Sequence, residues 1–149
     1  MTQSNTADTR EVAAQEAIAT GRRRSVTVEG LAHTFPVPNA CRIGNLIVSS
    51  AIHSTDRVTR VIPEDLLSQC ALLFANVKTI VEAAGGSTRD IIKMTFFVRD
   101  RNNRGPLNDE WVQMFPDSDS RPARHSQLLH AEGPSLIQCD FIALIDSAS

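Results

Sequence analysis

The chain has no tyrosine and a single tryptophan among its 149 residues. Proteins that bind single-stranded nucleic acid stack bases on aromatic side chains, and this composition leaves few of them for that purpose. A basic surplus is missing too, because 15 lysines and arginines face 17 aspartates and glutamates, giving a net charge of −2. Since a general nucleic-acid binder is usually basic, the composition argues against nucleic acid as a partner.

Cysteines and long apolar runs are also scarce. The three cysteines, Cys41, Cys70 and Cys139, lie far apart and form no CxxC pair. An odd number without framework spacing indicates reduced thiols in a cytoplasmic protein. No 18 consecutive residues are apolar, and the first 24 residues contain no apolar core of a secretory signal. We therefore expect no membrane-spanning segment and no membrane partner.

Sequence motifs that bind metals or nucleotides are missing as well. GxGxxG and Walker A patterns do not occur, and no GxSxG surrounds a serine. The histidines have no HExxH or HxH spacing, so we expect them at the surface or in packing contacts, and we predict neither a metal nor a cofactor. These histidines are His33, His53, His125 and His130.

The length suits one domain with its own core, and we expect a polar tail over residues 1–24 followed by a single domain over 25–149. Helices are predicted from Pro63 to Ala84, stopped by Gly85-Gly86, and from Pro106 to Phe115 after a cap at Gly105. Strands are predicted at 25–30, 41–52 (a hairpin turning at Gly44-Asn45), 91–100, 124–130 and 134–146. The order β-β-β-α-β-α-β-β predicts an α+β fold with helices on one face of a sheet.

The last strand carries Asp140 in the middle of an apolar run. One face of this strand, with Cys139 and Phe141, should meet the helices. The other face, with Asp140 and Ile142, is also largely apolar, so we expect an oligomer interface to cover it. A buried, unpaired carboxylate costs several kcal/mol, which raises the question of its partner.

Arg124 is the natural partner of Asp140 in the sequence. It follows Pro122-Ala123 at the start of a strand that we expect beside the last one. A guanidinium grips a carboxylate through two hydrogen bonds. Two interpretations stay open: a structural ion pair, or an anion-binding arginine with Asp140 as an acid/base or water-orienting group.

Five stretches carry a resemblance to a known family. They are RIGNLIVSSAI, LLFANVKTIVEAAGGSTRDIIKMTFFVRD, LNDEWVQMFP, RPARHS and IQCDFIAL. In this combination the chain resembles, over residues 25–147, the Rid family of reactive intermediate deaminases, also called the YjgF family. The resemblance implies a homotrimer with a chorismate-mutase-like fold, a mixed, mainly antiparallel sheet, and clefts between subunits. It also implies hydrolysis of imines and enamines, such as 2-aminoacrylate, to a keto acid and ammonia without a cofactor.

The resemblance also implies roles for individual residues. Arg124 falls on the arginine that binds the substrate carboxylate, and Asp140 on the acid of the last strand, here shorter by one methylene. Asn108 and Ser50 fall on further cleft residues. The chain departs from the family pattern at four positions. Val37 stands where the family has tyrosine, Ala51 and Ile52 stand for glycine and glutamine, and Ser126 stands for cysteine. These departures predict a reshaped and more apolar cleft.

Three alternatives to a general imine deaminase remain. A pathway-specific deaminase of 2-aminomuconate, an enamine dicarboxylate, would need a second cation, for which His53 or His125 are candidates. A non-catalytic binder of small carboxylates would keep Arg124 without needing Asp140. An endoribonuclease is the least favoured, since only the run Arg22–Arg24 supports it.

Overall fold

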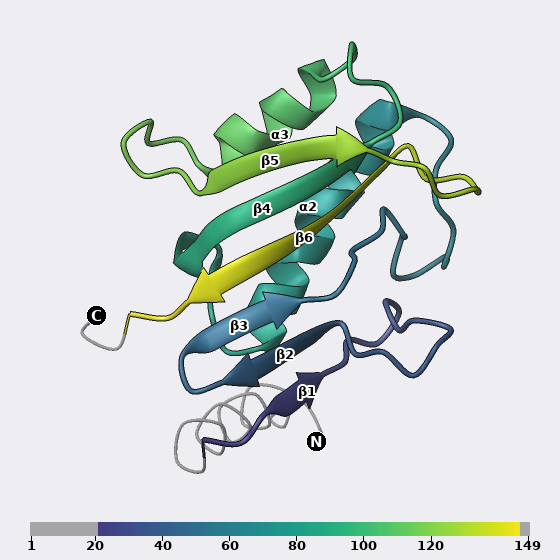
Figure 1. The fold of residues 1–149 in the computed structure, drawn as a ribbon. Helices are drawn as coiled ribbons and strands as arrows, with labels where there is room; N and C mark the ends of the chain where they lie inside the picture. The colour runs from purple at the N-terminus through teal and green to yellow at the C-terminus, as the bar shows by residue number, and fades with distance from the viewer. Residues whose placement is uncertain (1–20, 147–149) are drawn as a thin grey trace.

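A computed structural model gives the structure of residues 21–146, so the first 20 residues of the predicted tail lie outside the described part. Six strands form one sheet in the order β1-β2-β3-β6-β4-β5. The helices α2 (Leu66–Ala83) and α3 (Gly105–Met114) both lie on one face of this sheet (Figure 1). The strands are β1 (Arg24–Val26), β2 (Ala40–Ile43), β3 (Leu46–Ser49), β4 (Ile91–Val98), β5 (Ala123–Leu128) and β6 (Ile137–Leu144). The predicted layer of sheet and helices is confirmed.

The sheet is mixed, because β4 and β5 run parallel while the other neighbouring pairs are antiparallel. Parallel strands need a crossover connection, and α3 supplies it. The hairpin of β2 and β3 turns at Gly44, whose φ is +54°, and Ile43 pairs with Leu46. A positive φ at the first turn position alone is what a type II′ turn requires, so the predicted turn is confirmed.

Both helices begin at a different residue from the one predicted. Asp65 is the N-cap of α2 and accepts a hydrogen bond of 2.8 Å from the Ser68 N–H. It therefore lies outside the helix, which begins three residues after Pro63, because its carboxylate satisfies a backbone donor that the helix leaves unpaired. Arg104, rather than Gly105, is the N-cap residue of α3.

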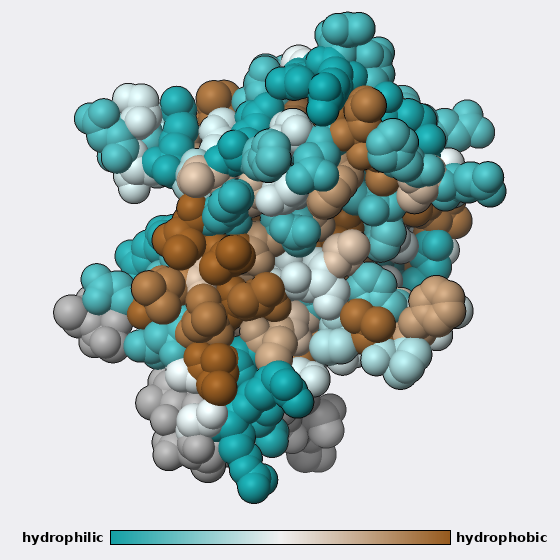
Figure 2. Space-filling view, in the orientation of Figure 1, coloured by the Kyte–Doolittle hydropathy of each residue, from teal (hydrophilic) through white to brown (hydrophobic). Residues whose placement is uncertain are grey.

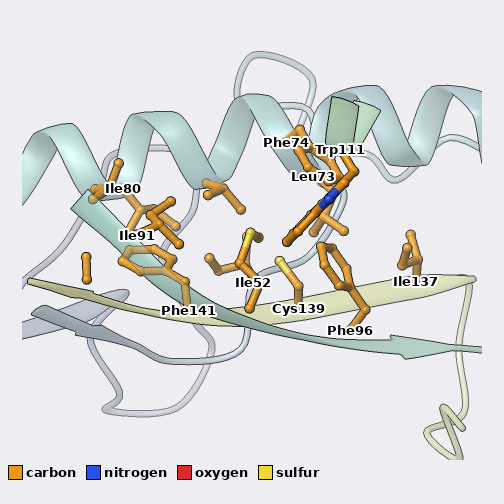
Figure 3. Packing of buried hydrophobic residues seen from close by; sticks show 14 of the residues in the cluster. Ile52, Leu73, Phe74, Ile80, Ile91, Phe96, Trp111, Ile137, Cys139 and Phe141 are labelled. Carbon is orange, nitrogen blue, oxygen red and sulfur yellow. The ribbon is translucent and has the colours of Figure 1, made fainter. Parts of the chain in front are cut away.

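The core lies between the sheet and the helices (Figure 3). The apolar stripe of α2, which includes Leu73 and Val77, is buried, and so are Cys139 and Phe141 on the helix side of β6. The two-residue period of the sequence predicts that Ile92 shares the buried face of Met94. This prediction is wrong, because Ile92 is 51% exposed. The register shifts between Ile91 and Lys93, and such a bulge turns one extra side chain out of the alternation.

Among the described residues, α2 alone is long and apolar enough to cross a membrane by length and composition. Eight of its residues are buried, and two of these are the polar Gln69 and Asn76. Figure 1 shows the helix lying along the sheet. This is the packing of a core helix, and core helices can be as long and as apolar as membrane-spanning ones.

Asn76 ties α2 to the chain that follows β3. Its side-chain amide donates to the carbonyl oxygens of His53 (2.8 Å) and Thr55 (2.9 Å). Asn76→Leu should leave these two carbonyls without a donor and lower the free energy of unfolding by about 2–3 kcal/mol. Denaturant unfolding measures this, with Lys78→Ala on the exposed side of α2 as the control. A variant as stable as the wild type would contradict the anchoring role.

Candidate active site

Arg124 lies on the helix side of the sheet, at the second position of β5. It pairs with the buried Met94 of β4. Its guanidinium carbon lies 5.6 Å from the ring centre of Phe96 and 5.2 Å from that of Trp111 in α3. These are cation–π distances. Burial, followed by the charge of Arg104, lowers the pKa of Arg124, but a guanidinium stays protonated throughout the physiological range.

Two more of the predicted site residues belong to this side of the molecule. Ser126 follows Arg124 by two positions on β5, so both side chains share one face. Asn108 is exposed and lies three residues before Trp111 on α3, which places the two on one side of the helix. The strand and the helix thus bring Arg124, Ser126 and Asn108 to the same edge of the sheet.

Asp140 lies on the opposite face of the sheet. Its neighbours Cys139 and Phe141 are buried under the helices, so the alternation of β6 turns Asp140 toward the open face. It is half-buried opposite Thr95 of β4. Burial raises the pKa of Asp140, and the nearby Lys93 opposes that rise. The predicted orientation, away from the helices, is confirmed.

The predicted pairing of Arg124 with Asp140 is wrong for a single chain. β4 lies between β5 and β6, so the strand of Arg124 does not neighbour the last strand. The two side chains also point to opposite faces of the sheet. Within one chain, the two residues therefore do not lie in one site.

Ser50 and Ala51 follow β3, which pairs with the strand of Asp140, and Val37 is an exposed residue of the segment before β2. The Ser50 N–H donates to the Asn39 carbonyl (3.0 Å), which joins the end of β3 to the segment that holds Val37. Val48 pairs with Ile142 and Ile52 pairs with Cys139, so Ser50 and Ala51 lie on the stretch of chain that runs past Asp140. Ala51 lines a cleft of about 260 Å³.

The same cleft contains His33 and His53, whose rings meet edge to face at 5.8 Å. Burial and the proximity of His33 lower the pKa of His53, so this ring favours its neutral form. His125 alternates with Arg124 on β5 and faces the other side of the sheet. Within one chain, His125 therefore does not share the face of Arg124, and His130 is exposed.

Arg104 is the cation whose charge, after burial, lowers the pKa of Arg124, and sequence reasoning missed it. It precedes α3 by one residue, seven positions before Trp111, which places it two helical turns from the ring that Arg124 contacts. Its Nε atom is buried without a hydrogen-bond partner. The Gly-Pro start of α3 was the available signal, because it fixes Arg104 at the helix terminus. In residues 21–146, no three histidine, cysteine or acidic side chains form a group that could hold a metal.

The open face of the sheet carries an exposed apolar patch. Figure 2 shows hydrophobic side chains gathered over β3 and the end of β6. Leu144 is 51% exposed and Val48 43% exposed, although both are strand residues. The patch consists of Ile43, Leu46, Val48, Ile142 and Leu144. Apolar patches on a sheet face are typical of interaction surfaces.

Comparisons with known proteins agree with this architecture. The family model described as Endoribonuclease L-PSP matches residues 31–128. The 2-iminobutanoate/2-iminopropanoate deaminase of Escherichia coli K12 is 34% identical over 90 residues, 60% of this chain and 70% of that protein. Two E. coli crystal structures, the YjgF gene product and TdcF with bound serine, are each 28% identical, with a TM-score of 0.75. Each comparison covers 83% of this chain and 99% of the other.

Proposed function

The chain belongs to the Rid/YjgF family, and from that premise we propose that it is a hydrolytic deaminase of imino and enamino acids. The observation that carries the proposal is Arg124, whose guanidinium is stacked on two aromatic rings and lacks a carboxylate partner within residues 21–146. Stacking occupies the face of a guanidinium and leaves its N–H edge for an anion. A relative named as an imine deaminase supports the same chemistry.

The proposed reaction is the addition of water to a C=N bond. Arg124 binds the substrate carboxylate and so fixes the position of the neighbouring imine carbon. Asp140 and a backbone carbonyl near Ser126 hold the attacking water, and Asp140 accepts its proton as the C–O bond forms. The C–N bond of the resulting carbinolamine then breaks. The substrate reacts as its protonated imine, so the nitrogen of the carbinolamine is an NH2 group that takes the returned proton and leaves as ammonia. The hydroxyl gives its proton to Asp140 as the C–N bond breaks, and the carbon becomes the carbonyl of a keto acid.

We propose that this site forms between two copies of the chain in a homotrimer of chorismate-mutase-like fold. One copy supplies Arg124, Asn108 and Ser126. The next supplies Asp140, together with Ser50, Ala51 and Val37. The opposite orientation of Arg124 and Asp140 and the apolar patch on the open face support this arrangement. We further propose a single domain over residues 25–149, and a cytoplasmic protein, for which the three free thiols argue.

Ammonia release tests the proposed reaction. Imines generated in place from alanine, leucine and serine by an amino-acid oxidase should lose ammonia faster with the protein than by spontaneous hydrolysis, and 2-aminomuconate should be assayed in parallel. Acceleration of at least one of these reactions is the expected result. No acceleration with any of them would refute the deaminase and favour a binder of small carboxylates.

Mixed oligomers test whether the site is shared between copies. Arg124→Ala and Asp140→Asn should each be inactive alone. When the two are unfolded together and refolded at equal amounts, about one interface in four receives both native residues, because each side is native with a probability of about one half. About a quarter of the wild-type activity should return. A site within one chain would recover no activity.

RNA is not the substrate that we propose, although the family description names an endoribonuclease. The net charge of −2 and the lack of tyrosine argue against an RNA-binding surface.

A further inference from the structure

Two histidines line the cleft of about 260 Å³ to which Ala51 also belongs. The rings of His33 and His53 meet edge to face, with 5.8 Å between their centres. The Nε2 atom of His33 is buried and makes no hydrogen bond within residues 21–146. Leaving such a nitrogen without a partner costs about 1–3 kcal/mol. An orphaned imidazole nitrogen in a cleft therefore indicates a position for a hydrogen-bonding ligand.

The backbone around this cleft is held in place without the two imidazoles. The side chain of Asn39 accepts a hydrogen bond of 2.8 Å from the Val28 N–H and donates one of 2.7 Å to the Leu31 carbonyl. The amide of Asn76 holds the carbonyl of His53 at 2.8 Å. These bonds fix both segments of chain and leave the rings available. A cleft formed in advance binds a ligand at little cost in ordering.

The lining of the cleft disfavours a charged ligand. Among the described residues that line it, none is a lysine, arginine, aspartate or glutamate. Burial, followed by the proximity of His33, lowers the pKa of His53, so the ring of His53 is uncharged at neutral pH. An ionised group that entered from water would lose its hydration without gaining an opposite charge. The chemistry of the cleft therefore suits an uncharged molecule.

A metal ion fits the cleft less well. Zinc sites in proteins use three or four protein ligands. Within residues 21–146, no three histidine, cysteine or acidic side chains form a group that could hold a metal, so His33 and His53 lack a third ligand. The two imidazoles are better suited to hydrogen bonding than to coordination.

We propose that this cleft binds a small, uncharged molecule with a hydrogen-bond donor and an acceptor on an apolar body, such as an amide attached to a ring. A neutral imidazole offers one donor and one acceptor, so His33 and His53 bind the polar end. The apolar body lies against Ile52, Ile62 and Ile80. The volume is below the range of about 300–1,000 Å³ that is usual for drug-sized ligands, so the ligand is small. This inference goes beyond the proposed deaminase, whose substrates carry a carboxylate.

Three molecules of one shape test the charge preference. Benzamide is uncharged, benzoate is its anionic counterpart and benzamidinium is its cationic one. In a titration followed by the NMR signals of the histidine side chains, benzamide should shift His33 and His53 together, with a Kd of about 1 mM as expected for so small a ligand. The exposed His130 should not respond. Benzoate and benzamidinium should bind at the two rings at least about tenfold more weakly.

His33→Phe keeps a ring beside His53 and removes the orphaned nitrogen. The affinity for benzamide should fall about tenfold, as expected for one lost hydrogen bond to a buried partner. His130→Phe, at an exposed position, is the matched control and should bind benzamide like the wild type. An unchanged affinity in His33→Phe would overturn the proposal. Should this variant fail to fold, the charge series on the wild type decides alone.

Other outcomes of the titration would also overturn the proposal. Tighter binding of benzoate or benzamidinium at the two rings would assign the cleft to a charged ligand. Tight binding of zinc alone to both rings would make the pair a metal site. No response of either ring to benzamide up to about 10 mM would exclude the amide class. Because none of these readouts is ammonia release, the inference and the proposed deaminase can fail separately.

Discussion

Arg124→Ala is expected to lower kcat/KM for imine hydrolysis by about a thousandfold. Truncating one partner of a desolvated, charged hydrogen-bond pair costs about 2–5 kcal/mol. The substrate would also lose the contact that fixes its imine carbon against the attacking water. Steady-state ammonia release measures the effect, and circular dichroism checks that the fold is retained. The stacking on Phe96 and Trp111 contributes only about 1 kcal/mol to stability.

Two controls make the Arg124 result specific. Arg101→Ala removes an exposed arginine from the turn before α3 and should keep the wild-type rate. Arg124→Lys keeps a charge but loses the planar fork, so its activity should lie between wild type and alanine. Wild-type turnover in Arg124→Ala would exclude the arginine from substrate binding and remove the basis of the proposed function.

Asp140→Asn is expected to change activity and stability in opposite directions. Loss of a general base lowers rates by about a hundredfold or more. Burial, however, raises the pKa of Asp140 in the folded protein, so above that pKa the ionised carboxylate destabilises the fold. Asparagine removes this penalty and should raise the thermal midpoint at neutral pH. Asp109→Asn on the exposed side of α3 should change neither quantity.

The pH dependence of the wild type follows from the same residue. Because Asp140 must be ionised to accept a proton, kcat/KM should fall as the pH drops through a pKa above the ordinary 3.8. Lys93 holds this pKa down, so Lys93→Met should move the acid limb of the profile to higher pH. An Asp140→Asn variant that is fully active, or an acid limb that does not respond to Lys93→Met, would show that Asp140 is not the base.

Local signals made most of the elements predictable. The turn at Gly44, the buried stripe of α2 and the alternation of β6 depend on residues close in sequence, and the structure contains all three. The bulge that exposes Ile92 was not predictable, because strict alternation places Ile92 on the same apolar face as Met94 and Phe96. The start of α2 was predicted three residues too early, at Pro63. An aspartate such as Asp65 is favourable both as an N-cap and within the first turn of a helix, so the sequence does not distinguish the two positions.

The site was only partly predictable because its geometry depends on strand order. Nothing in the residues of β5 and β6 indicates that β4 separates them, so Arg124 and Asp140 were expected to pair. Arg104 escaped notice for a related reason. Its effect on the pKa of Arg124 arises only when α3 folds back beside β5, which places Trp111 against Arg124.

The residues proposed for the two halves of the site lie on separate stretches of the chain. Asn108, Trp111 and Arg124 lie on α3 and β5, whereas Asp140 lies on β6 and Ser50 follows β3. Under the proposed function, the part that binds the substrate is thus one continuous segment, separate in the gene from the part that handles water and protons. Residues 105–128 are therefore the unit to graft onto another member of the family when altering its substrate range.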